Sequence, residues 1–108
     1  MKWLKVFDSK EKALEAIPQN GARLLKIGER RISLANYQGN IYATDNKCPH
    51  NGEALSQGKV NYLGEIICPW HNYRYSLKNG RECQQRTEDV ETYPISEKDD
   101  GLYIGIPE

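Results

Sequence analysis

The side chains best suited to chemistry lie in the segment from Cys48 to His71. It begins with Cys-Pro-His and, after seventeen further residues, ends with Cys-Pro-Trp-His, so each end offers one thiolate and one imidazole. Thiolates and imidazoles are ligands for zinc and for iron in proteins. The pattern therefore predicts two short loops that hold a metal centre between them.

Three interpretations of this pattern use the four side chains differently. A [2Fe–2S] cluster of the Rieske type takes two cysteines on one iron and two histidines on the other. A single tetrahedral zinc ion accepts the same ligands, although zinc fingers place the cysteines on one arm and the histidines on the other. The third alternative is coincidence, but the chain has only two histidines and each lies within three residues of a cysteine. The mixed pairs favour the cluster, with Cys48 and Cys68 on one iron and His50 and His71 on the other.

The first loop is similar to that of a known family, the Rieske ferredoxins. In that family C-x-H-x-G is followed by a leucine and, shortly beyond it, a glycine. Here the segment reads C-P-H-N-G-E-A-L-S-Q-G, which places Cys48, His50, Gly52, Leu55 and Gly58 at the matching positions.

The second loop also resembles that family. It reads C-P-W-H-N-Y-R-Y-S-L-K-N-G, with Cys68, Pro69, His71, Tyr75 and Gly80 at the matching positions. Asn72 stands where the family commonly has glycine. Asparagine is the other residue most at ease with positive φ, so we expect the turn to form.

The resemblance implies an all-β Rieske iron–sulfur fold with one [2Fe–2S] cluster per chain. This fold is an antiparallel β sandwich or barrel with one short helix and an inserted cluster-binding subdomain, here at about residues 45–80 of a single domain 1–108. It places the histidines at the tip of the protein near solvent. The implied function is one-electron transfer from a reductase to a terminal oxygenase, both docking transiently at that tip. Such a ferredoxin is an electron-transfer component and not itself an enzyme.

The elements that must position the loops are mostly strands. Alternating and β-branched segments bounded by turn residues predict strands at 22–27, 31–37, 41–44, 65–68, 73–77, 90–96 and 102–106. One helix is predicted over Asp8–Ile17, with Asp8 as its N-cap and Ala13, Leu14 and Ile17 as its apolar stripe.

Three further side chains near the loops have alternative interpretations. The hydroxyl of Tyr75 either donates a hydrogen bond to the sulfur of Cys48 or Cys68, or its ring is simply packed. Trp70 is expected to pack beside the cluster, in an apolar collar with Pro49 and Leu55, and also to contact a partner. Cys83 has no cysteine left to pair with inside the chain, so we interpret it as a partly buried thiol.

Composition excludes other classes of function. Lys and Arg number 15, as do Asp and Glu, and the absence of a basic run argues against nucleic-acid binding. No apolar stretch reaches the length of a signal sequence or a membrane span, so we expect a monomeric cytoplasmic protein without a membrane anchor. Two other functions stay open: a Rieske-like small subunit of a larger reductase, such as nitrite reductase, and a zinc-stabilised binding module.

Overall fold

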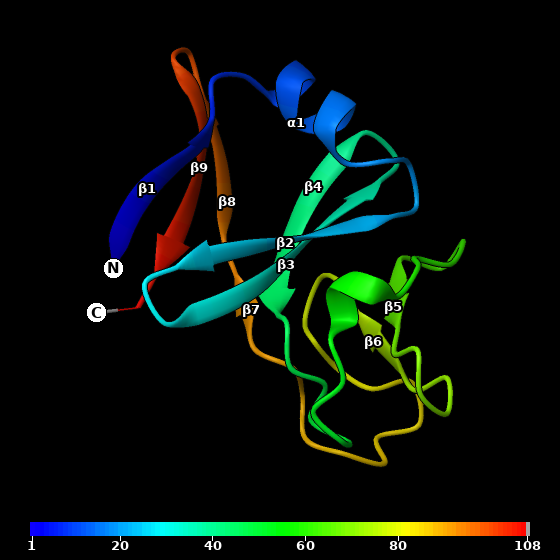
Figure 1. Ribbon diagram of the computed structural model, residues 1–108. Coiled ribbons are helices and arrows are strands. Elements are labelled where there is room, and N and C mark those ends of the chain that lie inside the picture. Colours follow the sequence, from blue (N-terminus) through cyan, green and yellow to red (C-terminus); the bar gives the residue numbers. More distant parts are fainter. Residues whose placement is uncertain (108) are drawn as a thin grey trace.

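The computed structural model describes residues 1–107, which form three antiparallel sheets, one α-helix and one 3-10 helix (Figure 1). The elements in chain order are β1 (Lys2–Phe7), α1 (Lys10–Ala16), β2 (Ala22–Ile27), β3 (Arg30–Tyr37), β4 (Asn40–Asp45), η1 (Leu55–Gln57), β5 (Glu65–Ile67), β6 (Arg74–Ser76), β7 (Thr92–Tyr93), β8 (Ile95–Lys98) and β9 (Gly101–Ile106). The predicted all-β class is confirmed.

Two of the sheets make the scaffold. One has the strand order β1-β9-β8 and the other β2-β3-β4-β7, and α1 contacts β1, β4 and β9 at one end of them (Figure 1). Side chains of the two sheets and of the helix segment form one apolar core, whose fully buried members include Ala13, Ile17, Ile32 and Ile104. Burial of this apolar surface is the main force that holds the scaffold together.

The helix forms where its apolar stripe predicts, but its cap was predicted wrongly. Ser9 and not Asp8 is the N-cap: its backbone is extended and its hydroxyl accepts a hydrogen bond from the Lys12 amide at 3.1 Å. Asp8 pairs instead with Lys5, at 3.5 Å. The serine is favoured because its short side chain reaches back to the third helical amide.

The strand predicted over 90–96 is interrupted. Pro94 separates β7, which pairs with β4, from β8, which pairs with β9. Proline has no amide hydrogen and cannot continue a ladder on that side. Its carbonyl accepts a hydrogen bond from Gly105, at 2.9 Å, so the chain passes here from one sheet to the other.

Residues 46–91, between β4 and β7, supply most of a second core, which also includes Ala35 of β3. The third sheet, β5-β6, lies in this segment on the side away from β1 and β9 (Figure 1). Leu55, Ile66 and Tyr75 are fully buried there, beside Cys48 and Cys68. The cluster-binding subdomain at about 45–80 within a single domain 1–108 stays a prediction.

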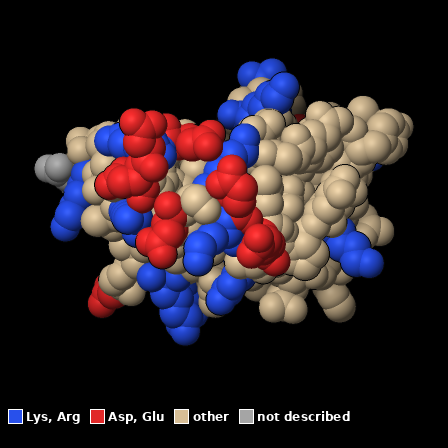
Figure 2. Space-filling model, turned by 90° about the horizontal axis from the view of Figure 1, so that it is seen from above, with Lys and Arg blue, Asp and Glu red and all other residues tan. Residues whose placement is uncertain are grey.

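Charged side chains are distributed unevenly over the surface. In the view of Figure 2 they crowd over the end of the molecule that carries the chain termini, whereas the opposite end shows few of them. Within residues 1–107 no helix is long and apolar enough to span a bilayer.

Candidate metal centre

Each of the two loops is closed by its own backbone hydrogen bonds. In the first loop the Cys48 amide donates to Glu53 at 2.9 Å, and the Gly52 amide donates to Cys48 at 2.8 Å. Gly52 has a φ of 81°, a conformation that a side chain would disfavour. These bonds hold the first cysteine in place.

The second loop reverses direction between β5 and β6. His71 and Asn72 both have positive φ, at 65° and 55°, and the Cys68 amide donates to the Tyr73 carbonyl at 2.7 Å. Two successive left-handed residues fit the tight turns that join antiparallel strands. The expectation that Asn72 supports this turn in place of glycine is confirmed.

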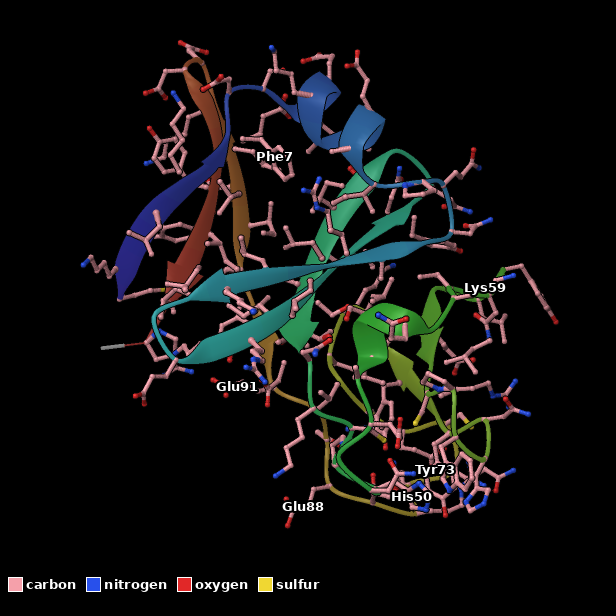
Figure 3. All side chains as sticks on the ribbon, viewed as in Figure 1. Phe7, His50, Lys59, Tyr73, Glu88 and Glu91 are labelled. Atoms are coloured by element: carbon pink, nitrogen blue, oxygen red, sulfur yellow. The ribbon has the colours of Figure 1, made fainter. Side chains whose placement is uncertain are left out.

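The loops bring the four predicted ligands to one end of the molecule. Cys48 and Cys68 are fully buried, His50 is half-buried and His71 is exposed, and the two imidazole rings lie 5.5 Å apart. Figure 3 shows His50 at the lower tip of the molecule, far from Phe7 in β1. Sulfur atoms therefore lie inside and imidazoles towards solvent.

The polar atoms of these residues fit a metal centre. Nδ1 of His50 is buried and has no hydrogen-bond partner among residues 1–107, whereas buried polar atoms are normally satisfied. Burial, together with the neighbouring Cys48 thiol, raises the pKa of Cys68 to about 11. The raised pKa means that burial disfavours the charged thiolate. A cation beside these sulfurs would offset this effect and keep them as thiolates.

Tyr75 contacts one of the buried sulfurs. Its hydroxyl lies 3.2 Å from Sγ of Cys48 and 3.3 Å from Oγ1 of Thr87. Burial and the hydrogen bond to Cys48 raise the pKa of Tyr75 above its usual value, so its hydroxyl is protonated at neutral pH. Of the two predicted sulfur partners, the structure places Cys48 beside it.

The three members of the predicted apolar collar differ in burial. Trp70 is 56% exposed and its ring centre lies 5.1 Å from that of His71. Pro49 is exposed as well, but Leu55 is fully buried in the core below the loops. Trp70 and Pro49 are thus surface residues of the tip, and Leu55 supports the loops from inside.

Near the site, Tyr73 lies in the second loop, whereas Arg86 and Glu82 have no signal in the sequence. The ring of Tyr73 stacks on that of His50, Arg86 lies over Tyr73, and Glu82 binds Arg86. Charged residues such as Glu82 and Arg86 ordinarily lie on the surface, and only the fold shows that Glu82 is fully buried. Cys83 is partly buried, as expected, and its Sγ lies 3.3 Å from Nη2 of Arg74.

Comparison with known proteins identifies the family. Residues 2–94 match the family model of the Rieske [2Fe-2S] domain. The chain belongs to the Rieske [2Fe–2S] family. This Rieske protein is 31% identical over 96 residues to the 3-phenylpropionate/cinnamic acid dioxygenase ferredoxin subunit of Photorhabdus laumondii, with 88% of this chain and 90% of the relative covered.

A second relative and a solved structure also match this chain. A ferredoxin component of the naphthalene 1,2-dioxygenase/salicylate 5-hydroxylase systems of Ralstonia sp is 36% identical over 83 residues, which are 76% of this chain and 79% of that one. A chain from the complex of reduced oxygenase and oxidized ferredoxin in carbazole 1,9a-dioxygenase superposes with a TM-score of 0.77, at 21% identity, over 94% of this chain and 91% of that one. At that identity the structural likeness shows the fold alone.

The family match and the two relatives confirm the predicted Rieske fold, the [2Fe–2S] cofactor and the role of electron carrier. This Rieske protein is an electron-transfer component and not a catalyst. A zinc-stabilised binding module is not supported.

Proposed function

We propose that this Rieske ferredoxin binds its cluster through Cys48 and Cys68 on one iron and His50 and His71 on the other, and carries single electrons from a reductase to a terminal oxygenase. The observation that carries the ligand assignment is the buried, unpartnered Nδ1 of His50 beside two fully buried cysteines. With four such ligands the cluster would have a reduction potential between about −150 and +300 mV.

The burial pattern supports electron exchange at the tip. The cysteines lie inside, where apolar packing keeps water from the sulfurs, and the exposed edge of His71 offers the shortest route to a docked protein. A partner that covers His71 would also cover Trp70, whose ring lies 5.1 Å away. Tryptophan is enriched among residues that dominate binding energy, so Trp70 is the expected anchor of docking.

The names of the relatives support an oxygenase as the electron acceptor. Both are ferredoxin components of oxygenase systems, and the carbazole dioxygenase structure is described as a complex between oxygenase and ferredoxin. Electron-transfer interfaces are small and transient, below about 1,200 Å². A monomer that presents one tip to the reductase and then to the oxygenase meets this requirement, and we propose a monomeric state for that reason.

We also propose a cytoplasmic location. Within residues 1–107 no two cysteines form a disulfide, which suits a reducing compartment. The alternative of a small subunit in a larger reductase is less well supported, because the relatives above are separate ferredoxin components.

The docking role of Trp70 can be tested against a matched tryptophan. We expect Trp70→Ala to lower the second-order rate of electron transfer from the reduced protein to a terminal oxygenase by about tenfold, with cluster content unchanged. Trp3→Ala removes an exposed tryptophan from β1, at the other end of the molecule, and should leave the rate unchanged. Equal rates for Trp70→Ala and wild type in stopped-flow experiments would contradict docking at this tip.

A further inference from the structure

A buried carboxylate lies close to the metal centre. Glu82, in the segment between β6 and β7, is 0% exposed. Its oxygens accept hydrogen bonds from the Sγ of Cys83, the backbone amides of Gln84 and Arg86, and the guanidinium of Arg86. The hydrogen bonds from Arg86 hold the pKa of Glu82 far below its usual range, so this carboxylate is ionised at neutral pH.

Glu82 fixes the orientation of the Arg86 guanidinium. Nε of Arg86 donates to Oε1 at 3.0 Å and Nη2 donates to Oε2 at 2.7 Å. This two-pronged geometry holds the planar guanidinium in one orientation, which a single contact would not do. A side chain that is 37% exposed is therefore held firmly in place.

The oriented guanidinium is stacked against an aromatic ring that in turn covers a proposed cluster ligand. Cζ of Arg86 lies 3.8 Å from the ring centre of Tyr73, and the same ring lies 3.8 Å from that of His50, at an interplanar angle of 10°. Two groups this close to one ring centre must occupy its opposite faces. Tyr73 is thus held between Arg86 and His50, and Figure 3 shows His50 and Tyr73 beside each other at the tip.

We propose that Arg86 is a positioning residue for electron transfer: held by Glu82, it clamps Tyr73 against His50 and places a guanidinium charge on the far side of the Tyr73 ring from this proposed ligand. This inference rests on the proposed ligand role of His50. Clamping restricts rotation of the imidazole, and the charge favours the reduced cluster because reduction adds one negative charge. The Tyr73 ring occupies the space between Arg86 and His50.

A purely structural role for the same contacts would be to fasten the segment after β6. Such a role predicts a change in thermal stability without a change in the cluster. Positioning predicts changes in the reduction potential and in the magnetic coupling of one histidine nitrogen to the reduced cluster. These two readouts separate the roles.

The test compares holoproteins carrying Arg86→Gln, Arg86→Lys and Arg81→Gln. Arg81 is an exposed arginine in the turn before Glu82, so Arg81→Gln removes the same charge without touching Tyr73. Reduction potentials are measured by voltammetry at low and high salt, and histidine nitrogen couplings by pulsed electron paramagnetic resonance of the reduced cluster.

We expect Arg86→Gln to lower the equilibrium constant for reduction about three- to tenfold, where tenfold corresponds to about 59 mV for one electron, and to alter one of two nitrogen couplings. Arg86→Lys should recover part of the potential but not the coupling, since lysine lacks the planar fork. Arg81→Gln should shift the potential much less and leave the couplings unchanged. If Arg86→Gln and Arg81→Gln behave alike, or if both couplings persist unchanged in Arg86→Gln, the inference is wrong.

Failure of the proposed function would be visible separately. A wild-type protein without two coupled histidine nitrogens would contradict the ligand assignment itself. Two normal couplings in wild type that do not respond to Arg86 would contradict only the positioning role.

Discussion

The hydroxyl of Tyr75 lies 3.2 Å from the sulfur of Cys48, and both side chains are fully buried. A cysteine bound to iron is a thiolate and has no proton to donate, so in the loaded protein Tyr75 is the donor of this bond. A donor to sulfur stabilises the more negative, reduced state of a cluster. This contact connects β6 to Cys48, the proposed iron ligand of the first loop.

Replacement of Tyr75 by phenylalanine should lower the reduction potential. If the hydrogen bond favours the reduced state by about 1 kcal/mol, its loss corresponds to roughly 40 mV for one electron. Iron content should not change, because the phenyl ring fills the same space. Voltammetry at constant pH measures the shift, and an unchanged potential would mean that the bond has no effect on the cluster.

Replacement of Thr87 by valine should act in the opposite direction. The Thr87 hydroxyl donates to the Glu88 carbonyl at 2.9 Å and can therefore only accept from Tyr75, at 3.3 Å. It competes with Cys48 for the single Tyr75 proton. Valine removes this competitor, and we expect the potential to rise by up to roughly 40 mV.

A double mutant is the control for this competition. Thr87→Val in a Tyr75→Phe background should leave the potential where Tyr75→Phe alone puts it, because the shared proton is gone. Thr87→Ser, which keeps the hydroxyl, should resemble wild type. If Thr87→Val still raised the reduction potential in the Tyr75→Phe background, Thr87 would not act through the Tyr75 proton.

Alanine in place of any one of the four proposed ligands should remove or destabilise the cluster. The intact protein should contain two irons and two acid-labile sulfides per chain. Iron and sulfide analysis, together with visible absorbance, checks both statements. Cys83→Ser is the matched control and should keep full iron content. If Cys83→Ser lost the cluster and His71→Ala kept it, the ligand assignment would be wrong.

The Glu82–Arg86 pair should make stability fall in acid. The pKa of Glu82 is lowered in the folded protein by hydrogen bonds from Arg86, so its contribution is fully present above the unfolded value of about 4.3. It is lost progressively as pH falls below that value towards the folded pKa. Between about pH 6 and pH 3, melting temperature should therefore decline more steeply in wild type than in Glu82→Gln.

At neutral pH Glu82→Gln should lower the melting temperature by about 5 °C, because a buried charge-assisted pair is broken. Circular dichroism melts measure both effects. Glu29→Gln, at an exposed position in the β2–β3 turn, should change neither the melting temperature nor its pH dependence. Parallel acid curves for wild type and Glu82→Gln would show that Glu82 is not the group responsible.

Much of the candidate centre could be predicted from local sequence. Two Cys–His pairs in short loops are compatible with only a few kinds of metal site. The tolerance of Asn72 for positive φ follows from its side chain alone. The helix over Lys10–Ala16 and the strands from Ala22 to Asp45 also follow from short-range apolar patterns and turn residues. These features depend on residues that are close in the chain.

The helix N-cap and the break between β7 and β8 could not be predicted from local sequence alone. Asp8 and Ser9 are both good caps, and only the structure shows that the Ser9 hydroxyl meets the Lys12 amide while Asp8 pairs with Lys5. Pro94 signals a break in any strand, but the transfer of the chain to a second sheet is seen only when β8 pairs with β9.

By itself the sequence predicted the metal centre, because each of its two histidines lies within three residues of a cysteine. Only the tertiary structure decided what surrounds it: Thr87 on Tyr75, Arg86 on Tyr73 and Glu82 beneath Arg86. These contacts form because the segment after β6 folds back against the second loop. The path of this segment depends on packing against residues far away in the sequence. Its residues therefore show no periodic pattern that would predict it.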